Sequence, residues 1–171
     1  ERDRVLVDVH HALGLLHTFE VRAIDLAGNV DLTPASYTWE VIPGPTANVT
    51  GGICVSPPSP SAGKIYLEFV NPLATPLSLS LASNSNTTLV KSSNVTTSVT
   101  GNTGTIMVKT TFGKTGTATL TFNVSDGTNT TQFVVTVNVG TNGNDTMTGT
   151  TGIDMIFGMS GNDTLNGDTG S

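Results

Sequence analysis

From residue 140 to the end, the chain repeats with a period of nine, and this period constrains the fold more than any other feature. Written in nines, the segment reads GTNGNDTMT, GTTGIDMIF, GMSGNDTLN and the incomplete GDTGS. Glycine stands at positions one and four, aspartate at position six and an apolar residue at position eight. The glycines are Gly140, Gly149, Gly158 and Gly167, then Gly143, Gly152, Gly161 and Gly170; the aspartates are Asp145, Asp154 and Asp163. A period this short predicts a stack of repeated turns and short strands.

The spacing has a direct physical interpretation. Six residues make a turn and three make a short strand, so the chain reverses every nine residues and returns to the same side every eighteen. Turns on one side then stack at the ordinary strand separation of about 4.8 Å. Calcium prefers about six to eight oxygen ligands. Carbonyl groups freed by the glycines and the aspartate carboxylates supply such oxygens, while Met147, Ile156 and Leu165 are expected to face a thin core.

The repeat resembles the RTX, or hemolysin-type, calcium-binding family, whose consensus is G-G-x-G-x-D-x-U-x. The resemblance implies a parallel β-roll that binds Ca²⁺ between stacked turns. This chain departs from the consensus at position two, where the second glycine is replaced by Thr141, Thr150, Met159 and Asp168. Because these residues reach positive φ less easily than glycine does, we expect weaker calcium affinity than the consensus would give.

Counting the turns predicts which aspartates share an ion. The turn at 140–145 pairs with the turn at 158–163, so Asp145 and Asp163 are the carboxylates of one complete site. The turn at 149–154 would pair with 167–172, which leaves Asp154 with half a site, and Asp168 is not expected to be a ligand. The expected ligand residues are Gly140, Asn142, Gly143, Asp145, Gly158, Ser160, Gly161 and Asp163, with Asp154 in the incomplete site. The alternative is that the tail is a flexible linker, which we expect to be its state without calcium.

The remainder of the chain predicts an all-β fold, with Ig-like β-sandwich units followed by the start of a parallel β-roll. Charged residues are only 12% of the chain, and Thr, Ser, Asn and Gly are abundant. We expect residues 1–42 to be the last strands of a truncated Ig-like or fibronectin-like domain, residues 43–50 a linker, residues 51–139 an Ig-like or cadherin-like sandwich of about seven strands, and residues 140–171 the calcium-binding repeats. The stretches HTFEVRAIDLAGNVDLTPASYTWEV and GKTGTATLTFNVSDGTNTTQFVVTV resemble the closing strands of repeats in bacterial surface proteins.

Other chemistry is weakly represented. The tail carries four aspartates and no base, and the chain has no basic patch for nucleic acid. No apolar run is long enough to span a membrane. The lone Cys54 forms no internal disulfide. It is expected to be buried, because a free cysteine usually packs as a small hydrophobic residue. His10, His11 and His17 are expected to be ordinary surface residues, and the segment at 158–162 only approaches a nucleophile elbow.

These features favour a binding role over catalysis. The first hypothesis is the C-terminal region of a secreted or surface-exposed bacterial adhesin, with calcium as its ion and a glycan or protein as the ligand of its modules. The resemblance implies type I secretion of an unfolded chain that folds in calcium-rich surroundings. The second hypothesis is the secretion and folding module of an RTX protease or lipase whose catalytic domain lies elsewhere. Further Ig-like repeats upstream would favour the adhesin, whereas a zinc helix or a nucleophile elbow would favour the hydrolase.

Overall fold

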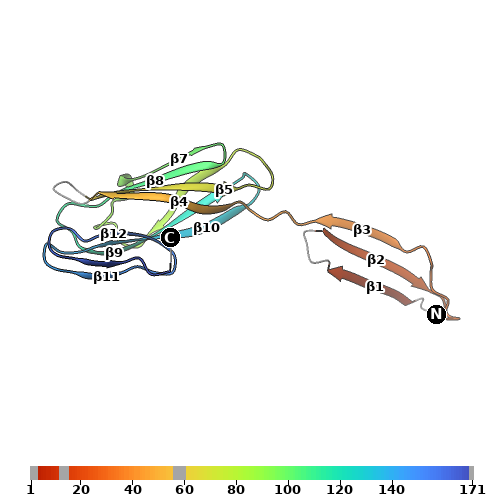
Figure 1. Ribbon diagram of the computed structural model, residues 1–171. Coiled ribbons are helices and arrows are strands. Elements are labelled where there is room, and N and C mark those ends of the chain that lie inside the picture. The colour runs from red at the N-terminus through yellow and green to blue at the C-terminus, as the bar shows by residue number, and fades with distance from the viewer. Residues whose placement is uncertain (1–3, 12–15, 56–60, 170–171) are drawn as a thin grey trace. The chain divides into compact units, whose positions relative to one another are not determined.

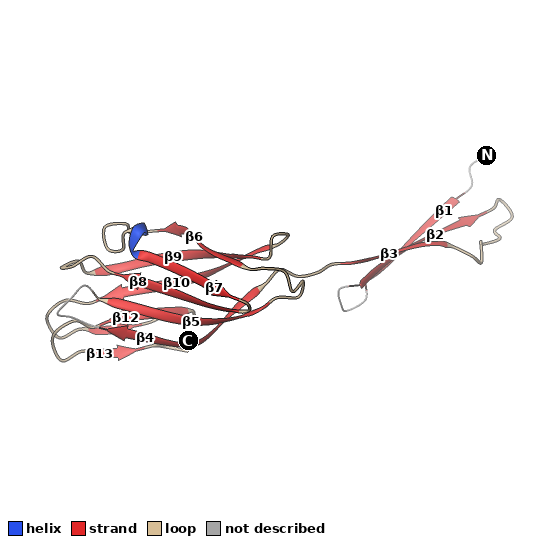
Figure 2. Cartoon of the chain, turned by 90° about the horizontal axis from the view of Figure 1, so that it is seen from above, coloured by secondary structure: helices blue, strands red, loops and turns tan. Residues whose placement is uncertain are grey.

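The structure, a computed structural model, describes residues 4–11, 16–55 and 61–169. Over these residues the chain is all-β, as the sequence predicts, with a single short 3-10 helix, η1 (Ser92–Asn94). The chain divides into two compact units, Glu1–Pro43 and Gly44–Ser171. Figure 1 labels the elements and Figure 2 distinguishes the strands from the loops.

The first unit is a three-stranded antiparallel sheet in the order β1-β2-β3. Its strands are β1 (Arg4–His11), β2 (Leu16–Ile24) and β3 (Ala35–Glu40). The rings of His17 and Trp39 stack across β2 and β3 with centroids 5.3 Å apart, and Tyr37 lies 6.2 Å from Trp39. After β2 the predicted turn forms, because Gly28 adopts a φ of 85° and the Asp25 carboxylate accepts backbone hydrogen bonds from Ala27 and Asn29.

The second unit contains two four-stranded sheets that share one buried core. One sheet has the order β4-β5-β8-β7, and the other has the order β12-β10-β9-β6. Their bounds are β4 (Thr46–Val55), β5 (Ala62–Val70), β6 (Ser78–Asn84), β7 (Val95–Thr100), β8 (Thr103–Lys109), β9 (Gly116–Ser125), β10 (Thr130–Val139) and β12 (Ile153–Phe157). Alternate side chains of β5, β8, β9 and β10 are buried, which is the period-two pattern that the sequence predicts.

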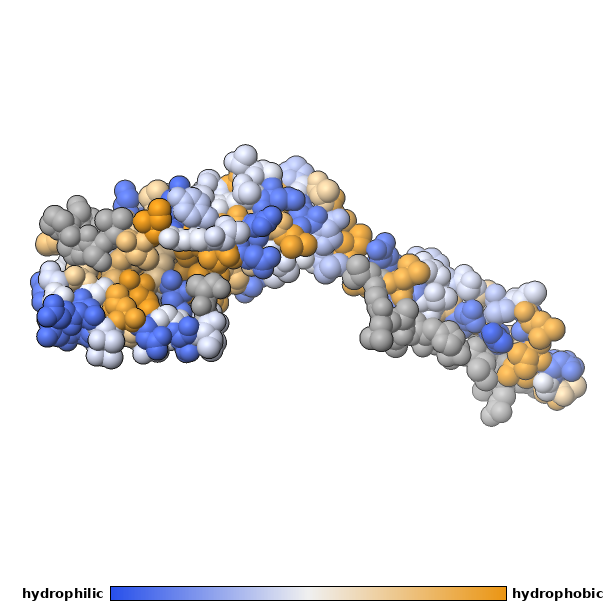
Figure 3. All heavy atoms as spheres, viewed as in Figure 1, coloured by the Kyte–Doolittle hydropathy of each residue, from blue (hydrophilic) through white to orange (hydrophobic). Residues whose placement is uncertain are grey.

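A small parallel sheet completes the second unit. It consists of β11 (Thr146–Thr148) and β13 (Thr164–Asn166). In Figure 3 hydrophilic residues gather at the lower left, where Figure 1 places the strands of the repeats. The repeats therefore divide between two sheets: β11 and β13 form their own, whereas β12 is an edge strand of the sandwich.

Three expectations from the sequence are wrong in detail. Residues 46–50, expected in a linker, lie in β4, because Thr46 to Val49 pair with β5. Cys54, expected to be buried, is exposed. Of the position-eight residues expected in the thin core, Leu165 is 49% exposed and Met147 and Ile156 are only partly buried. The buried hydrophobic side chains of the repeats are instead Met155 and Phe157, because β12 packs against the sandwich.

Candidate metal centre

The repeats wind with the predicted eighteen-residue return. Thr146 of β11 pairs in parallel with Thr164 of β13, and the register continues to Thr148 and Asn166. Backbone hydrogen bonds also join successive turns: the Gly140 N–H donates to the Phe157 carbonyl over 2.8 Å, and the Gly149 N–H donates to the Asn166 carbonyl over 2.7 Å. The turns at 140–145 and 158–163 consequently stack on one side, as the sequence predicts.

The two stacked turns bring Asp145 and Asp163 together. The Asp145 backbone N–H donates to Oδ1 of Asp163 over 2.9 Å, and the Thr164 N–H donates to the Asp145 carbonyl over 2.8 Å. One layer further out, the Asn162 N–H donates to Oδ1 of Asn144 over 2.8 Å. Both carboxylates are half-buried, and no described Lys or Arg side chain forms an ion pair with either of them. The turns thus hold two acidic groups that lack a basic partner among the described residues.

The glycines of these turns leave room that no other residue would leave. A Cβ placed on Gly140 would lie 2.7 Å from Oδ2 of Asp145 and 3.0 Å from the Gly158 carbonyl oxygen. A Cβ on Gly158 would lie 2.5 Å from Oδ2 of Asp163, and one on Gly161 would collide with the Gly143 carbonyl. The space that a side chain would fill is therefore bounded by carboxylate and carbonyl oxygens, which are the ligands of a hard cation such as Ca²⁺.

Two further predicted ligands lie differently. Asn142 and Ser160 are exposed residues in the bends of the two stacked turns, and their side chains form none of the hydrogen bonds that join the turns. At these two positions the backbone carbonyl oxygen, whose place is fixed by the turn, is therefore the candidate ligand.

Asp154 is built like Asp145 but faces a different neighbour. Its Oδ2 accepts a hydrogen bond from the Thr150 N–H over 2.7 Å. A Cβ on Gly149 would lie 2.8 Å from that oxygen and 2.9 Å from the Gly167 carbonyl oxygen. The start of the last repeat therefore covers this turn, but it brings no second position-six aspartate. Asp168 is exposed, and its Oδ1 accepts a hydrogen bond from the Thr169 N–H over 2.8 Å, which places it in a local turn.

The replaced glycines of position two behave in two ways. Met159 and Asp168 adopt left-handed φ values of 71° and 60°, so a non-glycine residue does not prevent this conformation here. Thr141 and Thr150 are not among the residues with positive φ. Their hydroxyl groups instead contact the aspartate of the same repeat, with the Thr141 Oγ1 lying 3.0 Å from Oδ2 of Asp145. The sequence did not predict these hydroxyl contacts, because they depend on the folded turn.

The carboxylate of Asp126, outside the repeats, closes a hairpin of the second unit. Asp126 follows β9, and its Oδ1 accepts the N–H groups of Thr128 and Asn129, which closes the hairpin to β10 with Gly127 at a φ of 91°. These hydrogen bonds, led by the Asn129 N–H, hold the pKa of the Asp126 carboxyl below its usual value. Within the described residues, no three His, Cys, Asp or Glu side chains gather as a metal-binding group.

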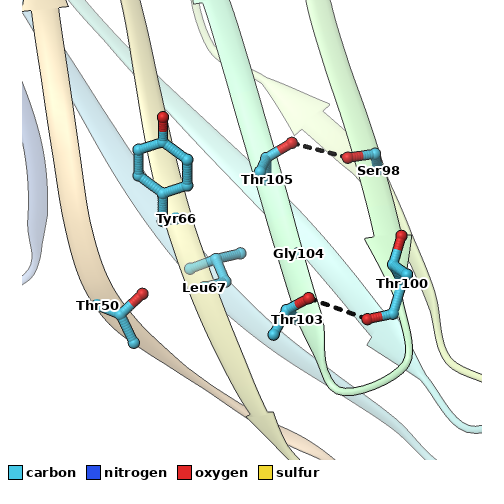
Figure 4. A pocket seen from close by; sticks show the side chains of 8 residues that line it. All are labelled: Thr50, Tyr66, Leu67, Ser98, Thr100, Thr103, Gly104 and Thr105. Carbon is cyan, nitrogen blue, oxygen red and sulfur yellow. Dashed lines mark hydrogen bonds between the residues drawn. The ribbon is translucent and has the colours of Figure 1, made fainter.

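A shallow hollow on the β4-β5-β8-β7 sheet is lined largely by hydroxyl groups (Figure 4). Two pairs of these groups are already bonded: Ser98 Oγ lies 2.7 Å from Thr105 Oγ1, and Thr103 Oγ1 donates to the Thr100 carbonyl over 2.9 Å. The hollow contains no titratable group other than Tyr66. It therefore offers a polar surface without a catalytic constellation.

The stacked, glycine-lined and oxygen-rich turns define a calcium-binding repeat of the β-roll class. The model of the RTX calcium-binding nonapeptide repeat family matches residues 139–171, in four copies. Residues 139–171 are therefore RTX repeats, and the resemblance seen in the sequence is confirmed for this segment.

Comparison with whole proteins adds no further assignment. No curated protein matches the chain in sequence. Two solved structures that resemble it are the endo-fucoidan hydrolases MfFcnA9 and MfFcnA4 of glycoside hydrolase family 107. The first is 16% identical with a TM-score of 0.37 over 77% of this chain, and the second is 15% identical with a TM-score of 0.38 over 84%. The chain spans only 25% of either protein, and at these TM-scores the likeness supports no inference about fold or function.

Proposed function

We propose that residues 139–171 bind calcium as they fold, with the principal ion between the turns at 140–145 and 158–163. The stacking of Asp145 on Asp163 around glycines that admit no side chain is the observation that carries this proposal. In the absence of a cation the two carboxylates repel each other, and the described tail provides no basic side chain to offset them. Bound calcium would supply the missing positive charge, and the carbonyls of the glycine turns would complete its oxygen shell.

The chain is proposed to act outside the cell, as part of a secreted or surface-exposed bacterial adhesin-like protein, and to bind rather than catalyse. RTX repeats are typical of secreted bacterial proteins, and here a separate β-sheet unit and the sandwich strands of the second unit precede them in the chain. Within the described residues no helix is long and apolar enough to cross a membrane. An affinity of about 10⁻⁴ to 10⁻³ M, as in extracellular calcium modules, would leave the turns at 140–145 and 158–163 unstacked where calcium is scarce and stack them where calcium is plentiful.

Calorimetric titration of the chain with calcium, and separately with magnesium, tests the proposal, with circular dichroism recorded at each step. We expect calcium-specific binding with a gain of β signal, because magnesium demands a tighter octahedral shell and gives up water reluctantly. Asp145→Ala and Asp163→Ala should abolish the main binding event. Asp168→Ala is the matched control and should leave it in place. Absence of binding at millimolar calcium in the unchanged chain would overturn the proposal.

Limited proteolysis tests the dependence on the compartment. At submicromolar calcium the turns at 140–145 and 158–163 should be cleaved quickly, and at millimolar calcium they should resist cleavage, since proteases act on the open state. Equal cleavage in both conditions would argue against folding controlled by external calcium.

A further inference from the structure

Strand β10, the last sandwich strand before the repeats, pairs with the second repeat as a strand of the roll would. The end of β10, from Val135 to Val139, pairs in parallel with β12, from Ile153 to Phe157. Each of these pairs is eighteen residues apart, which is the same offset that joins Thr146 to Thr164 within the repeats. Figure 1 shows β12 beside the sandwich strands. The eighteen-residue winding of the roll therefore begins in β10, ahead of the first repeat.

The second repeat is adapted to this position. Its position-seven and position-nine residues, Met155 and Phe157, are 1% and 0% exposed and belong to the sandwich core. A Cβ on Gly63 of β5 would lie 2.8 Å from Sδ of Met155 and 3.2 Å from Cζ of Phe157, so the two sheets meet closely here. In the first and third repeats these positions hold the exposed polar residues Thr146, Thr148, Thr164 and Asn166.

The two turns of the proposed metal centre follow directly on the paired ends of β10 and β12, Val139 and Phe157. The turn at 140–145 is held there by the hydrogen bond from Gly140 to the Phe157 carbonyl. The turn at 158–163 follows Phe157 directly, and its second residue, Met159, packs against the sandwich core. The Ser61 hydroxyl, just before β5, donates to Sδ of Met159 over 3.2 Å. The sandwich thus fixes the starting points of both turns.

We infer that the sandwich is the template of the roll: β12 docks on β10 without calcium and presets the two turns, so that packing of Met155 and Phe157 sets the calcium affinity. The inference rests on the proposed calcium function. Its physical basis is preorganisation, since an ion that binds only when the turns are stacked has an apparent affinity reduced by the fraction of molecules in which they are not stacked. In an isolated short roll, calcium binding must order every turn and strand. When β12 is already docked, fewer residues lose conformational freedom on binding, so the affinity is higher.

The first test compares two equal truncations in the full chain. Phe157→Ala should weaken calcium binding by about tenfold, within the usual range of coupling between sites, although Phe157 carries no ligand side chain. Phe122→Ala is the matched control, because Phe122 is also 0% exposed but lies in β9, two strands away from β12. Its calcium affinity should stay within about twofold of the unchanged chain, measured by calorimetry where both variants are folded. Equal affinities for the two variants would overturn the inference and leave the proposed function standing.

A second variant guards against unfolding by Phe157→Ala. Gly63→Val alters no residue of the repeats, suits a strand, and pushes on Met155 and Phe157 from the opposite sheet. It should also lower the calcium affinity, and an unchanged affinity would count against the template.

Hydrogen exchange without calcium tests the docking itself. The amides of β12 that pair with β10 should be protected, whereas those of β13 should exchange rapidly. Equal exchange in β12 and β13 would overturn the template. If the unchanged chain binds no calcium, the proposed function fails and the control of affinity fails with it, but the exchange pattern still decides whether β12 is docked.

Discussion

Strands β12 and β13 carry the same nonapeptide repeat but are stabilised by different means. Each begins at the end of a glycine turn with its position-six aspartate, Asp154 as the second residue of β12 and Asp163 just before β13. β12 joins the sandwich sheet and buries Met155 and Phe157, whereas every residue of β13 is exposed, including Leu165 at 49%. The turns are alike, so the difference lies in what covers the strands.

The same repeat sequence pattern can thus pack against a sandwich, as in β12, or against another repeat, as in β13. Full burial of a side chain as large as Phe or Met contributes about 1.5–3 kcal/mol, and β12 obtains this from the sandwich without any ion. β13 carries one apolar residue, the exposed Leu165, and it pairs with β11 beside the stacked turns that end in Asp145 and Asp163. Packing therefore holds one side of the roll, and we expect a cation to hold the other.

The largest expected effect comes from truncating methionine on the two sides of the roll. Without calcium, Met155→Ala should lower the free energy of unfolding of the second unit by about 2–5 kcal/mol, the usual cost of a cavity in a core. The same change at Met147 in β11, which is only partly buried, should cost less than about 1 kcal/mol. Urea denaturation followed by circular dichroism measures both, because the single tryptophan, Trp39, lies in the first unit. Equal costs at the two positions would remove the distinction between β12 and the rest of the roll.

Calcium binding should have the next largest effect on stability, and it should stabilise the turns that precede β11 and β13. At a free concentration of about one hundred times its dissociation constant, the ion should stabilise the folded tail by about 2.7 kcal/mol through mass action. Asp163→Asn should remove this gain, since the amide keeps the shape and loses the charge. Asp168→Asn should preserve it, because Asp168 lies in a local turn. A gain that survives in Asp163→Asn would place the ion elsewhere.

Much of this arrangement could be predicted from the sequence, because it depends on local periodicity. The nine-residue period predicts the pairing of Asp145 with Asp163, and alternation predicts the buried faces of β5, β8, β9 and β10. These patterns reflect the geometry of strands and turns, in which neighbours along the chain decide which side chains share a face.

The docking of β12 could not be predicted, because it depends on a partner distant in the sequence. The one available signal was GTTGIDMIF, the only repeat with apolar residues at positions seven, eight and nine. Three consecutive apolar residues fit a strand with apolar contacts on both faces, and in β12 Met155 and Phe157 are buried on one side while Ile156 is partly buried on the other. Similarly, the sequence predicts a linker over 43–50, where β4 begins, because this stretch has little hydrophobic signal and a register shift interrupts the strand between Val49 and Gly51.

Alkylation of Cys54 sharpens the comparison with a smaller effect. The thiol is exposed on β4, yet desolvation by neighbouring atoms raises its pKa, partly offset by a backbone hydrogen bond from Ile156 in β12. A raised pKa leaves little thiolate near neutral pH, so alkylation should be slow. Phe157→Ala, which disturbs the packing of β12 without altering Gly63, the strand partner of Cys54, should speed it several-fold at pH 7.5, whereas Asp163→Asn should not change it. If neither variant alters the rate, Cys54 does not sense the docking of β12.

The smallest expected effect concerns a carboxylate that the sandwich holds without an ion. Backbone N–H groups, chiefly that of Asn129, lower the pKa of Asp126, so its ionised form is favoured in the folded state. A carboxyl with a depressed folded pKa contributes stability above its unfolded pKa, near 3.8, and loses that contribution as pH falls through the folded value.

In calcium-free buffer the second unit should therefore lose stability between about pH 5 and pH 3, and Asp126→Asn should flatten this slope. Denaturation midpoints across that range measure the effect, with Asp168→Asn as the control. An unchanged slope in Asp126→Asn would mean that the hydrogen bonds of the hairpin carboxylate contribute no measurable acid stability to the sandwich.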